Sequence, residues 1–256
     1  MPDILDKFIE KAKENAANGY YANPPKYSGA RHSLLRTLAG QDFSLICEIK
    51  HASPAGEYSF EAVNAEKLGK DFRDSGADAI SVVVEPQIFR GRLSNVPEAK
   101  QAGLPVLFKD FVIDFEQIKA AKICGADAML LVVKVANRLS LDLDALISEA
   151  HRQGLEVLLE SYDDEEMRQA MKTDADMLGI NNRDLQTLIV DLSRTGRVIE
   201  ASGGVDRPTI SESGVLFAED VRYVRKFDVK GVLVGTAIWK APSIKEKISE
   251  LKSGSK

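Results

Sequence analysis

The sequence has few of the residues that build disulfides or metal sites. It contains two cysteines, Cys47 and Cys124, and three histidines, His32, His51 and His151. Both cysteines stand in apolar surroundings, which is typical of reduced core thiols rather than of a disulfide. The histidines show no metal-ligand spacing with one another or with a cysteine. We therefore expect neither a disulfide nor a bound metal.

Long apolar runs and an excess of positive charge are also missing. The most apolar stretch, Ala128–Val133, is far shorter than the ~18 to 20 residues of a membrane-spanning helix. The N-terminal segment Met1–Glu14 has an amphipathic helix pattern without the apolar core of a signal peptide. The net charge of −5 disfavours broad capture of nucleic acid or acidic membranes. We expect a cytoplasmic protein with neither kind of partner.

What the sequence does contain is a regular alternation of strand and helix patterns. Nearly continuous apolar runs rich in β-branched residues indicate strands that are buried on both faces. The predicted strands are Leu45–Lys50, Ala79–Glu85, Pro105–Lys109, Ala128–Lys134, Leu155–Glu160, Asp176–Asn181, Pro208–Glu212 and Gly231–Gly235. Amphipathic patterns between them predict helices over Phe60–Ser75, Asp114–Cys124, Leu141–Gln153, Asp163–Lys172, Phe217–Phe227 and Ser243–Leu251.

Eight strand and helix units on about 210 residues predict an α/β fold, the closed parallel (β/α)₈ barrel also called a TIM barrel. The segments Ser75–Glu85 and Cys124–Lys134 resemble each other closely, as expected of a barrel built from similar units. An open doubly wound sheet is the alternative, but no Gly-x-Gly-x-x-Gly follows the first strand. With no linker in sight, we expect a single domain over residues 1–256, with an N-terminal helical extension (1–44) and the barrel (45–256).

Charged and polar side chains gather at the C-terminal ends of the predicted strands, where such barrels carry their chemistry. They are Glu48, Lys50, Glu85, Lys109, Lys134, Glu160, Asn181, Arg183, Glu212 and Ser213. Taken singly, Lys134 can reach solvent, and Glu160 and Glu212 can accept hydrogen bonds from loop amides. Glu48 and Lys50 share one strand face, and a buried ion pair is a poor stability device. So many converging polar groups favour an active site.

Glycines mark the ends of the seventh and eighth predicted strands, within Ser211–Val215 and Val232–Thr236. A glycine there lets an anion approach the backbone amides, and the helix that follows adds its positive end. Phosphate groups usually bind at this place in (β/α)₈ barrels. We therefore predict a phosphate-bearing ligand. No nucleophilic Cys or Ser with a His partner is visible, which disfavours covalent acyl chemistry.

Six ordered motifs resemble those of the indole-3-glycerol phosphate synthase family. They are Cys47–Pro54, Pro105–Phe111, Leu159–Glu166, Gly179–Leu185, Ile210–Gly214 and Leu233–Gly235. The resemblance implies a carboxy-lyase of tryptophan biosynthesis that needs no cofactor or metal. Such an enzyme converts 1-(2-carboxyphenylamino)-1-deoxyribulose 5-phosphate, a small anion with a phosphate and a carboxylate, to indole-3-glycerol phosphate with loss of CO₂ and water.

The same resemblance implies roles for individual residues. Lys109 would act as general acid on the substrate carbonyl, and Glu160 as general base or as a stabiliser of cationic charge. Lys50, oriented by Glu48, would bind an anionic group and donate a proton for dehydration. Substrate binding and the proton network would be completed by Asn181, Arg183 and Glu212. The phosphate would be held by Ser213, Gly214, Gly235 and Thr236, with Ser53 nearby, and the aromatic pocket would be lined by Phe89 and Phe111.

Two alternatives remain beside this interpretation. One is another phosphate-binding barrel, such as a phosphoribosyl isomerase, which would be expected to use an Asp or Cys acid–base pair at the strand ends. The other is a non-catalytic phosphate-binding relative, which would have lost a lysine or a glutamate from the strand ends. The chain departs from the family pattern at His51, usually Arg or Lys, and at Gly91-Arg92, usually Gly-Ser.

Overall fold

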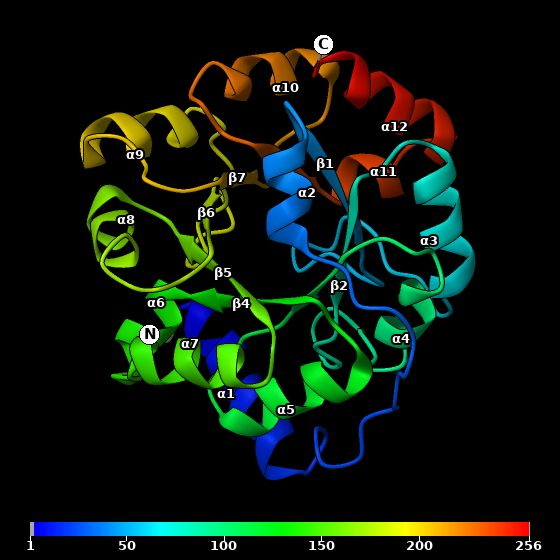
Figure 1. The fold of residues 1–256 in the computed structure, drawn as a ribbon, viewed down its shortest axis with the longest axis vertical. Helices are drawn as coiled ribbons and strands as arrows, with labels where there is room; N and C mark the ends of the chain where they lie inside the picture. The colour runs from blue at the N-terminus through cyan, green and yellow to red at the C-terminus, as the bar shows by residue number, and fades with distance from the viewer. Residues whose placement is uncertain (1–2, 256) are drawn as a thin grey trace.

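Eight parallel strands form a closed barrel in the computed structural model, which describes residues 3–255. Met1 and Pro2, the first residues of the predicted N-terminal helix, and Lys256 lie outside the described residues. The strands pair in sequence order, and β8 pairs with β1 to close the ring (Figure 1). They are β1 (Ser44–Ile49), β2 (Ala79–Val83), β3 (Val106–Lys109), β4 (Ala128–Val132), β5 (Glu156–Ser161), β6 (Met177–Asn181), β7 (Thr209–Glu212) and β8 (Gly231–Val234). The predicted (β/α)₈ barrel is confirmed.

Helices surround this ring (Figure 1). Six correspond to predicted helices: α3 (Ala65–Asp74), α5 (Phe115–Cys124), α7 (Leu143–Arg152), α8 (Asp164–Ala170), α10 (Ala218–Arg225) and α12 (Ile244–Ser253). The N-terminal helix is α1 (Ile4–Ala17), and the unpredicted helices are α2 (Leu34–Gly40), α4 (Asn95–Lys100), α6 (Val133–Leu139), α9 (Arg194–Ser202) and α11 (Thr236–Trp239). None of the helices within residues 3–255 is long and apolar enough to cross a membrane.

Several predicted boundaries were wrong by a few residues, such as the end of the second strand at Val83 rather than Glu85, and two of them have a clear local cause. The fourth strand ends at Val132 rather than Lys134, because α6 begins at Val133 within the same apolar run. The helix predicted from Phe60 begins at Ala65, where the Asn64 side chain accepts a hydrogen bond from the Lys67 amide, 2.8 Å away, and caps the first turn.

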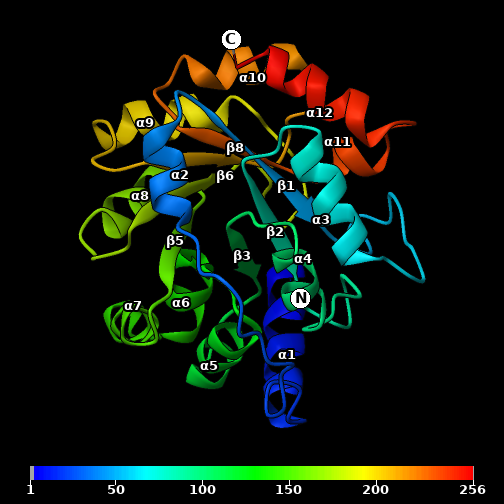
Figure 2. The same ribbon diagram turned by 45° about the vertical axis from the view of Figure 1, so that its right-hand side comes forward.

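The two helices of the N-terminal extension pack against the core inside the ring. Leu34 and Leu38 of α2 are fully buried, and Leu38 lies 3.4 Å from the position of an added Cβ on Gly231, the first residue of β8. Helix α2 therefore covers the N-terminal opening (Figure 1). Leu5 and Phe8 of α1 join the same apolar cluster, and α1 lies beside α5 (Figure 2). Burial of both apolar faces attaches the extension to the barrel.

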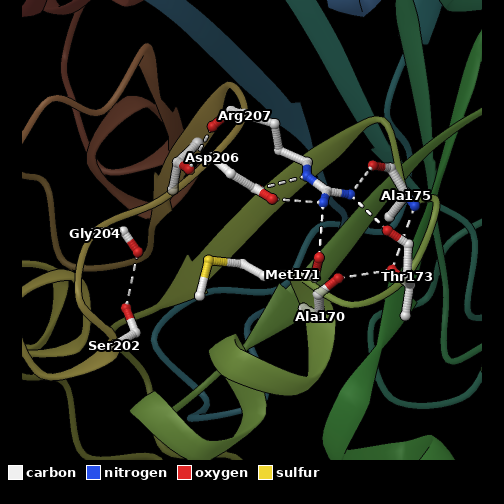
Figure 3. Close-up of polar contacts among 9 residues, drawn as sticks. Ala170, Met171, Thr173, Ala175, Ser202, Gly204, Asp206 and Arg207 are labelled. Atoms are coloured by element: carbon white, nitrogen blue, oxygen red, sulfur yellow. Dashed lines mark hydrogen bonds and ion pairs between the residues drawn. The ribbon is translucent and has the colours of Figure 1, made fainter.

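Arg207, just before β7, is a charged side chain at the N-terminal side of the barrel. Its guanidinium donates to the carbonyls of Met171, Thr173 and Ala175 at distances of 2.9, 2.8 and 2.6 Å (Figure 3). Asp206 pairs with the same guanidinium, 2.8 Å from Nε. These acceptors belong to the end of α8 and the turn before β6, so Arg207 ties that turn to β7.

Candidate active site

A cavity of about 580 Å³ opens at the C-terminal ends of the strands. Its walls include twelve of the fourteen predicted site residues: Glu48, Lys50, Phe89, Lys109, Phe111, Glu160, Asn181, Arg183, Ser213, Gly214, Gly235 and Thr236. The other two predicted residues, Ser53 and Glu212, stand behind the lining. The strand ends thus bring nearly all of the predicted groups to one concave site, which is the usual form of a small-molecule site.

Lys109, the last residue of β3, lies between two carboxylates. Its Nζ is 2.5 Å from Oε2 of Glu212 and 3.8 Å from Oε2 of Glu160. Burial alone would lower the pKa of Lys109, but the charges of Glu212, Glu160 and Glu48 outweigh burial and raise it above its usual value. Lys109 is therefore protonated at neutral pH and has a proton to donate.

Glu160 differs from Glu212 because Lys109 is too far away to hydrogen-bond it. Burial and the charge of Glu212 raise the pKa of Glu160 to about 8, although Lys109 and a hydrogen bond from Asn181 oppose the shift. A carboxyl group with a pKa near the working pH can both accept and release a proton.

Gly179 of β6, the register partner of Glu160, leaves space for Glu212, since a Cβ at Gly179 would lie 2.4 Å from Oε1 of Glu212.

Glu48 and Lys50 form the ion pair expected from strand alternation, with 2.8 Å between Oε1 of Glu48 and Nζ of Lys50. Burial would raise the pKa of Glu48, but the charges of Lys50, Lys109 and Arg183 prevail and lower it. Trp239 of α11 donates from Nε1 to the backbone carbonyl of Glu48 at 2.9 Å and so fixes the strand position that carries the ion pair. Glu48 stays ionised and keeps the Lys50 ammonium at the cavity wall.

The two predicted glycine turns line one side of the cavity together. Ser213 and Gly214 have φ values of 64° and 88°, a left-handed backbone that exposes amide groups after β7. Gly235 precedes α11, and a Cβ there would lie 2.6 Å from Oε1 of Glu48. The packing of Glu48 therefore requires a glycine at position 235.

The aromatic side of the cavity has a member that the sequence did not reveal. Phe89 and Phe111 lie on the loops after β2 and β3, with ring centroids 6.3 Å apart. Phe8 of α1 stacks on Phe111 at 4.8 Å and lies 5.9 Å from Phe89. The apolar face of α1 was visible in the sequence as Ile4, Leu5, Phe8 and Ile9, but nothing local showed that it faces the barrel mouth.

Other predicted residues have local partners. Ser53 donates from Oγ to Glu57 at 2.8 Å, and Glu57 approaches Arg183 at 3.9 Å. The sequence did not identify Glu57 as part of the cavity wall. Glu85 accepts the backbone amides of Ile88 and Phe89 at 2.6 and 2.9 Å, so it anchors the loop that carries Phe89.

Within residues 3–255, Lys134 is not among the residues that line the cavity. It lies in α6, where its Nζ is 3.8 Å from Glu166 and 3.8 Å from the ring centroid of Tyr162. Lys134 thus has local structural partners and its side chain is only 16% exposed, so it neither lines the cavity nor simply reaches solvent. His51 also faces away from the cavity and contacts Asn95 at 2.8 Å, as strand alternation predicts.

Together, the fold and the site define a (β/α)₈-barrel enzyme with lysine and glutamate side chains at its C-terminal mouth. The model of the indole-3-glycerol phosphate synthase family matches residues 7–251. An indole-3-glycerol phosphate synthase of Bacillus cereus is 36% identical over 98% of this chain and 99% of its own. One from Acetivibrio thermocellus is 37% identical over 83% of this chain and 81% of its own. The chain belongs to the indole-3-glycerol phosphate synthase family.

Solved structures with less similar sequences share the fold alone. An N-acetylmannosamine-6-phosphate 2-epimerase from Clostridium perfringens has a TM-score of 0.63 at 16% identity, over 83% of this chain and 93% of its own. A thiamine phosphate pyrophosphorylase from Pyrococcus furiosus has a TM-score of 0.59 at 18% identity, over 84% of this chain and 96% of its own.

Proposed function

We propose that this protein closes the indole ring, converting 1-(2-carboxyphenylamino)-1-deoxyribulose 5-phosphate to indole-3-glycerol phosphate with release of CO₂ and water. The observation that carries the proposal is the position of Lys109 between Glu212 and Glu160 in a barrel of this family. The ionisable side chains at the strand ends of this wall are lysines and glutamates, whereas a phosphoribosyl isomerase would be expected to use an Asp or Cys pair there. The wall also contains Asp110 and Asp220, but Asp110 is bonded to Tyr21 and Gln117, and Asp220 accepts the amides of Leu216 and Phe217.

Ring closure requires a proton at the substrate carbonyl oxygen as the aromatic carbon attacks the carbonyl carbon. Lys109 supplies this proton, because its ammonium is held charged at the cavity wall by Glu212. The new carbon–carbon bond places positive charge on the aryl amine, and Glu160 lies where a carboxylate can stabilise that charge. Loss of CO₂ from the ring carbon then returns an electron pair to the ring.

Dehydration follows, in which the hydroxyl group leaves as water and a ring proton is removed. Lys50 donates to the leaving oxygen, and Glu160 accepts the remaining proton. Lys50 is suited to this step because Glu48 holds its ammonium 2.8 Å away, and the same ammonium binds the substrate carboxylate before CO₂ is lost. Asn181 and Arg183 complete the polar wall.

The rest of the cavity fits the two ends of such a substrate. The amides near Ser213, Gly214, Gly235 and Thr236 bind the phosphate. The aryl ring lies among Phe8, Phe89 and Phe111, where apolar burial favours a planar aromatic group.

The test is to mix the purified protein with 1-(2-carboxyphenylamino)-1-deoxyribulose 5-phosphate, without added metal, and to follow indole fluorescence. We expect fluorescence to rise with the intact protein and to stay flat with Lys109→Ala. Lys119→Ala is the matched control, because Lys119 pairs with Glu116 on the exposed side of α5 and should not affect turnover. Intact protein that binds the substrate without any rise would overturn the proposal.

A further inference from the structure

A buried hydrogen-bond network links the N-terminal segment to the loop that follows Lys109. The Tyr21 hydroxyl donates to Oδ2 of Asp110 at 2.6 Å, although 89 residues separate the two in sequence. Asp110 directly follows Lys109 and is 4% exposed. Such a buried carboxylate costs stability unless it is well paired, so its position next to the proposed acid calls for a reason.

The network holds both backbone polar groups of Phe111. Oδ1 of Asp110 accepts the Phe111 amide at 2.9 Å, and Nε2 of Gln117 donates to the Phe111 carbonyl at 2.9 Å. Gln117 also donates to Oδ2 of Asp110 at 3.2 Å, the oxygen that Tyr21 contacts. Tyr21, Asp110 and Gln117 thus form a closed network. This network fixes the backbone of Phe111 and, through the chain, that of Lys109.

We propose that Tyr21 and Asp110 are positioning residues, which hold the turn Lys109–Phe111 so that the ammonium and the phenyl ring face the same substrate. The inference rests on the proposed function. Asp110 is not a proton donor in it, because its carboxylate oxygens are occupied by Tyr21, Gln117 and the Phe111 amide. The N-terminal segment in this way takes part in aligning the site as well as covering it.

The neighbouring residue provides a matched control. Tyr20 is also a tyrosine of the N-terminal segment, and its hydroxyl donates to the Val84 carbonyl at 2.9 Å and accepts the Leu93 amide at 3.2 Å. It attaches the same segment to the β2 side of the barrel without contacting Asp110. Tyr20→Phe and Tyr21→Phe each remove one hydrogen-bonded hydroxyl and keep the ring, so we expect only Tyr21→Phe to disturb the Lys109–Phe111 turn.

The experiment measures kcat and the melting temperature of the wild type, Tyr20→Phe and Tyr21→Phe, together with the inhibition constant of inorganic phosphate. We expect Tyr21→Phe to lower kcat about tenfold, since small misplacements of a reacting group are costly. Inorganic phosphate should inhibit all three proteins equally, because the phosphate turns after β7 and β8 are untouched. Both substitutions should lower the melting temperature by a similar amount, because each removes one hydrogen-bonded hydroxyl. Tyr20→Phe should nevertheless keep kcat within about twofold of the wild type.

A second variant covers the case in which Tyr21→Phe does not fold. Asp110→Asn keeps an acceptor for the Phe111 amide, so it should retain more activity than Asp110→Ala, by about tenfold in kcat. Equal kcat values for the two Asp110 variants, or for Tyr20→Phe and Tyr21→Phe, would overturn the inference. An inactive wild type would instead refute the proposed function.

Discussion

Glu160 is a carboxyl group whose surroundings disfavour its ionisation. It is 3% exposed, and the charge of Glu212 adds to the effect of burial. Lys109 does not cancel these effects, because it pairs with Glu212 at 2.5 Å and stays 3.8 Å from Glu160. Glu160 is therefore a carboxyl group beside a lysine that nevertheless has a raised proton affinity, as expected of a group that has to exchange protons.

The first prediction concerns the pH dependence of turnover. Because the pKa of Glu160 is raised to about 8 and a base acts in its ionised form, kcat/KM should rise about tenfold per pH unit below pH 7 and level off above pH 8. Rates of the wild type and of Glu160→Gln across pH 6 to 9 check this. The residual rate of Glu160→Gln should lack this rise, whereas Glu165→Gln, at an exposed residue of α8, should keep it.

The same pKa gives a prediction for stability. In the unfolded chain Glu160 ionises near pH 4.5, whereas in the fold it holds its proton up to about pH 8. The unfolded state therefore loses its proton first, and this contribution to stability is complete below pH 4.5 and is lost as the pH rises to 8. The free energy of unfolding of the wild type minus that of Glu160→Gln should decrease over this window in urea titrations. A difference independent of pH would contradict the raised pKa.

Gly179 offers a test of the space around Glu212. An alanine Cβ would lie 2.4 Å from Oε1 of Glu212, so the carboxylate has to leave its present position beside Lys109. We expect Gly179→Ala to lower the free energy of unfolding by about 1 to 3 kcal/mol and kcat at least about tenfold. Gly40→Ala is the control, since an added Cβ there meets no atom within 4 Å. Wild-type kcat in Gly179→Ala would exclude a role for this contact.

At the scale of elements, the regular parts of the barrel were predictable and the short additions were not. All eight strands followed from apolar β-branched runs, and the rim charges after them marked the site. The boundary at Val133 was missed because an apolar run has the same appearance in a buried strand and in a buried helix. The position of Phe8 was missed because amphipathicity shows that a helix has a buried face and not what that face contacts.

Arg207 acts on the connection between two elements, and its removal should separate stability from activity. Arg207→Ala leaves the carbonyls of Met171, Thr173 and Ala175 without their charged donor (Figure 3). We expect a loss of about 2 to 4 kcal/mol in the free energy of unfolding, with unchanged kcat at a temperature where both proteins are folded. Arg222→Ala, which breaks an exposed pair with Glu219, should cost less than about 1 kcal/mol.

At the scale of the whole molecule, the N-terminal extension is fastened at both ends of the barrel. Helix α1 packs at the mouth, and α2 covers the opposite opening. Between them, Asp127 accepts the His32 amide at 2.8 Å and pairs with Lys100 at 2.6 Å, with neither side chain of that pair exposed. Each link buries atoms of both parts, so neither part keeps its native surroundings when the other unfolds.

The last prediction is therefore that the extension and the barrel unfold as one unit. Trp239, the single tryptophan, reports on the barrel mouth through its bond to the Glu48 carbonyl, and far-UV circular dichroism reports on all helices. The two signals should give one coincident transition in urea.

Asp127→Asn should lower the free energy of unfolding measured by both signals by the same amount, about 3 to 5 kcal/mol, because Lys100 then stays buried without a counter-charge. Asp228→Asn, at a side chain that is 84% exposed, should shift neither. An early loss of helix signal with unchanged tryptophan fluorescence would show instead that the extension unfolds by itself.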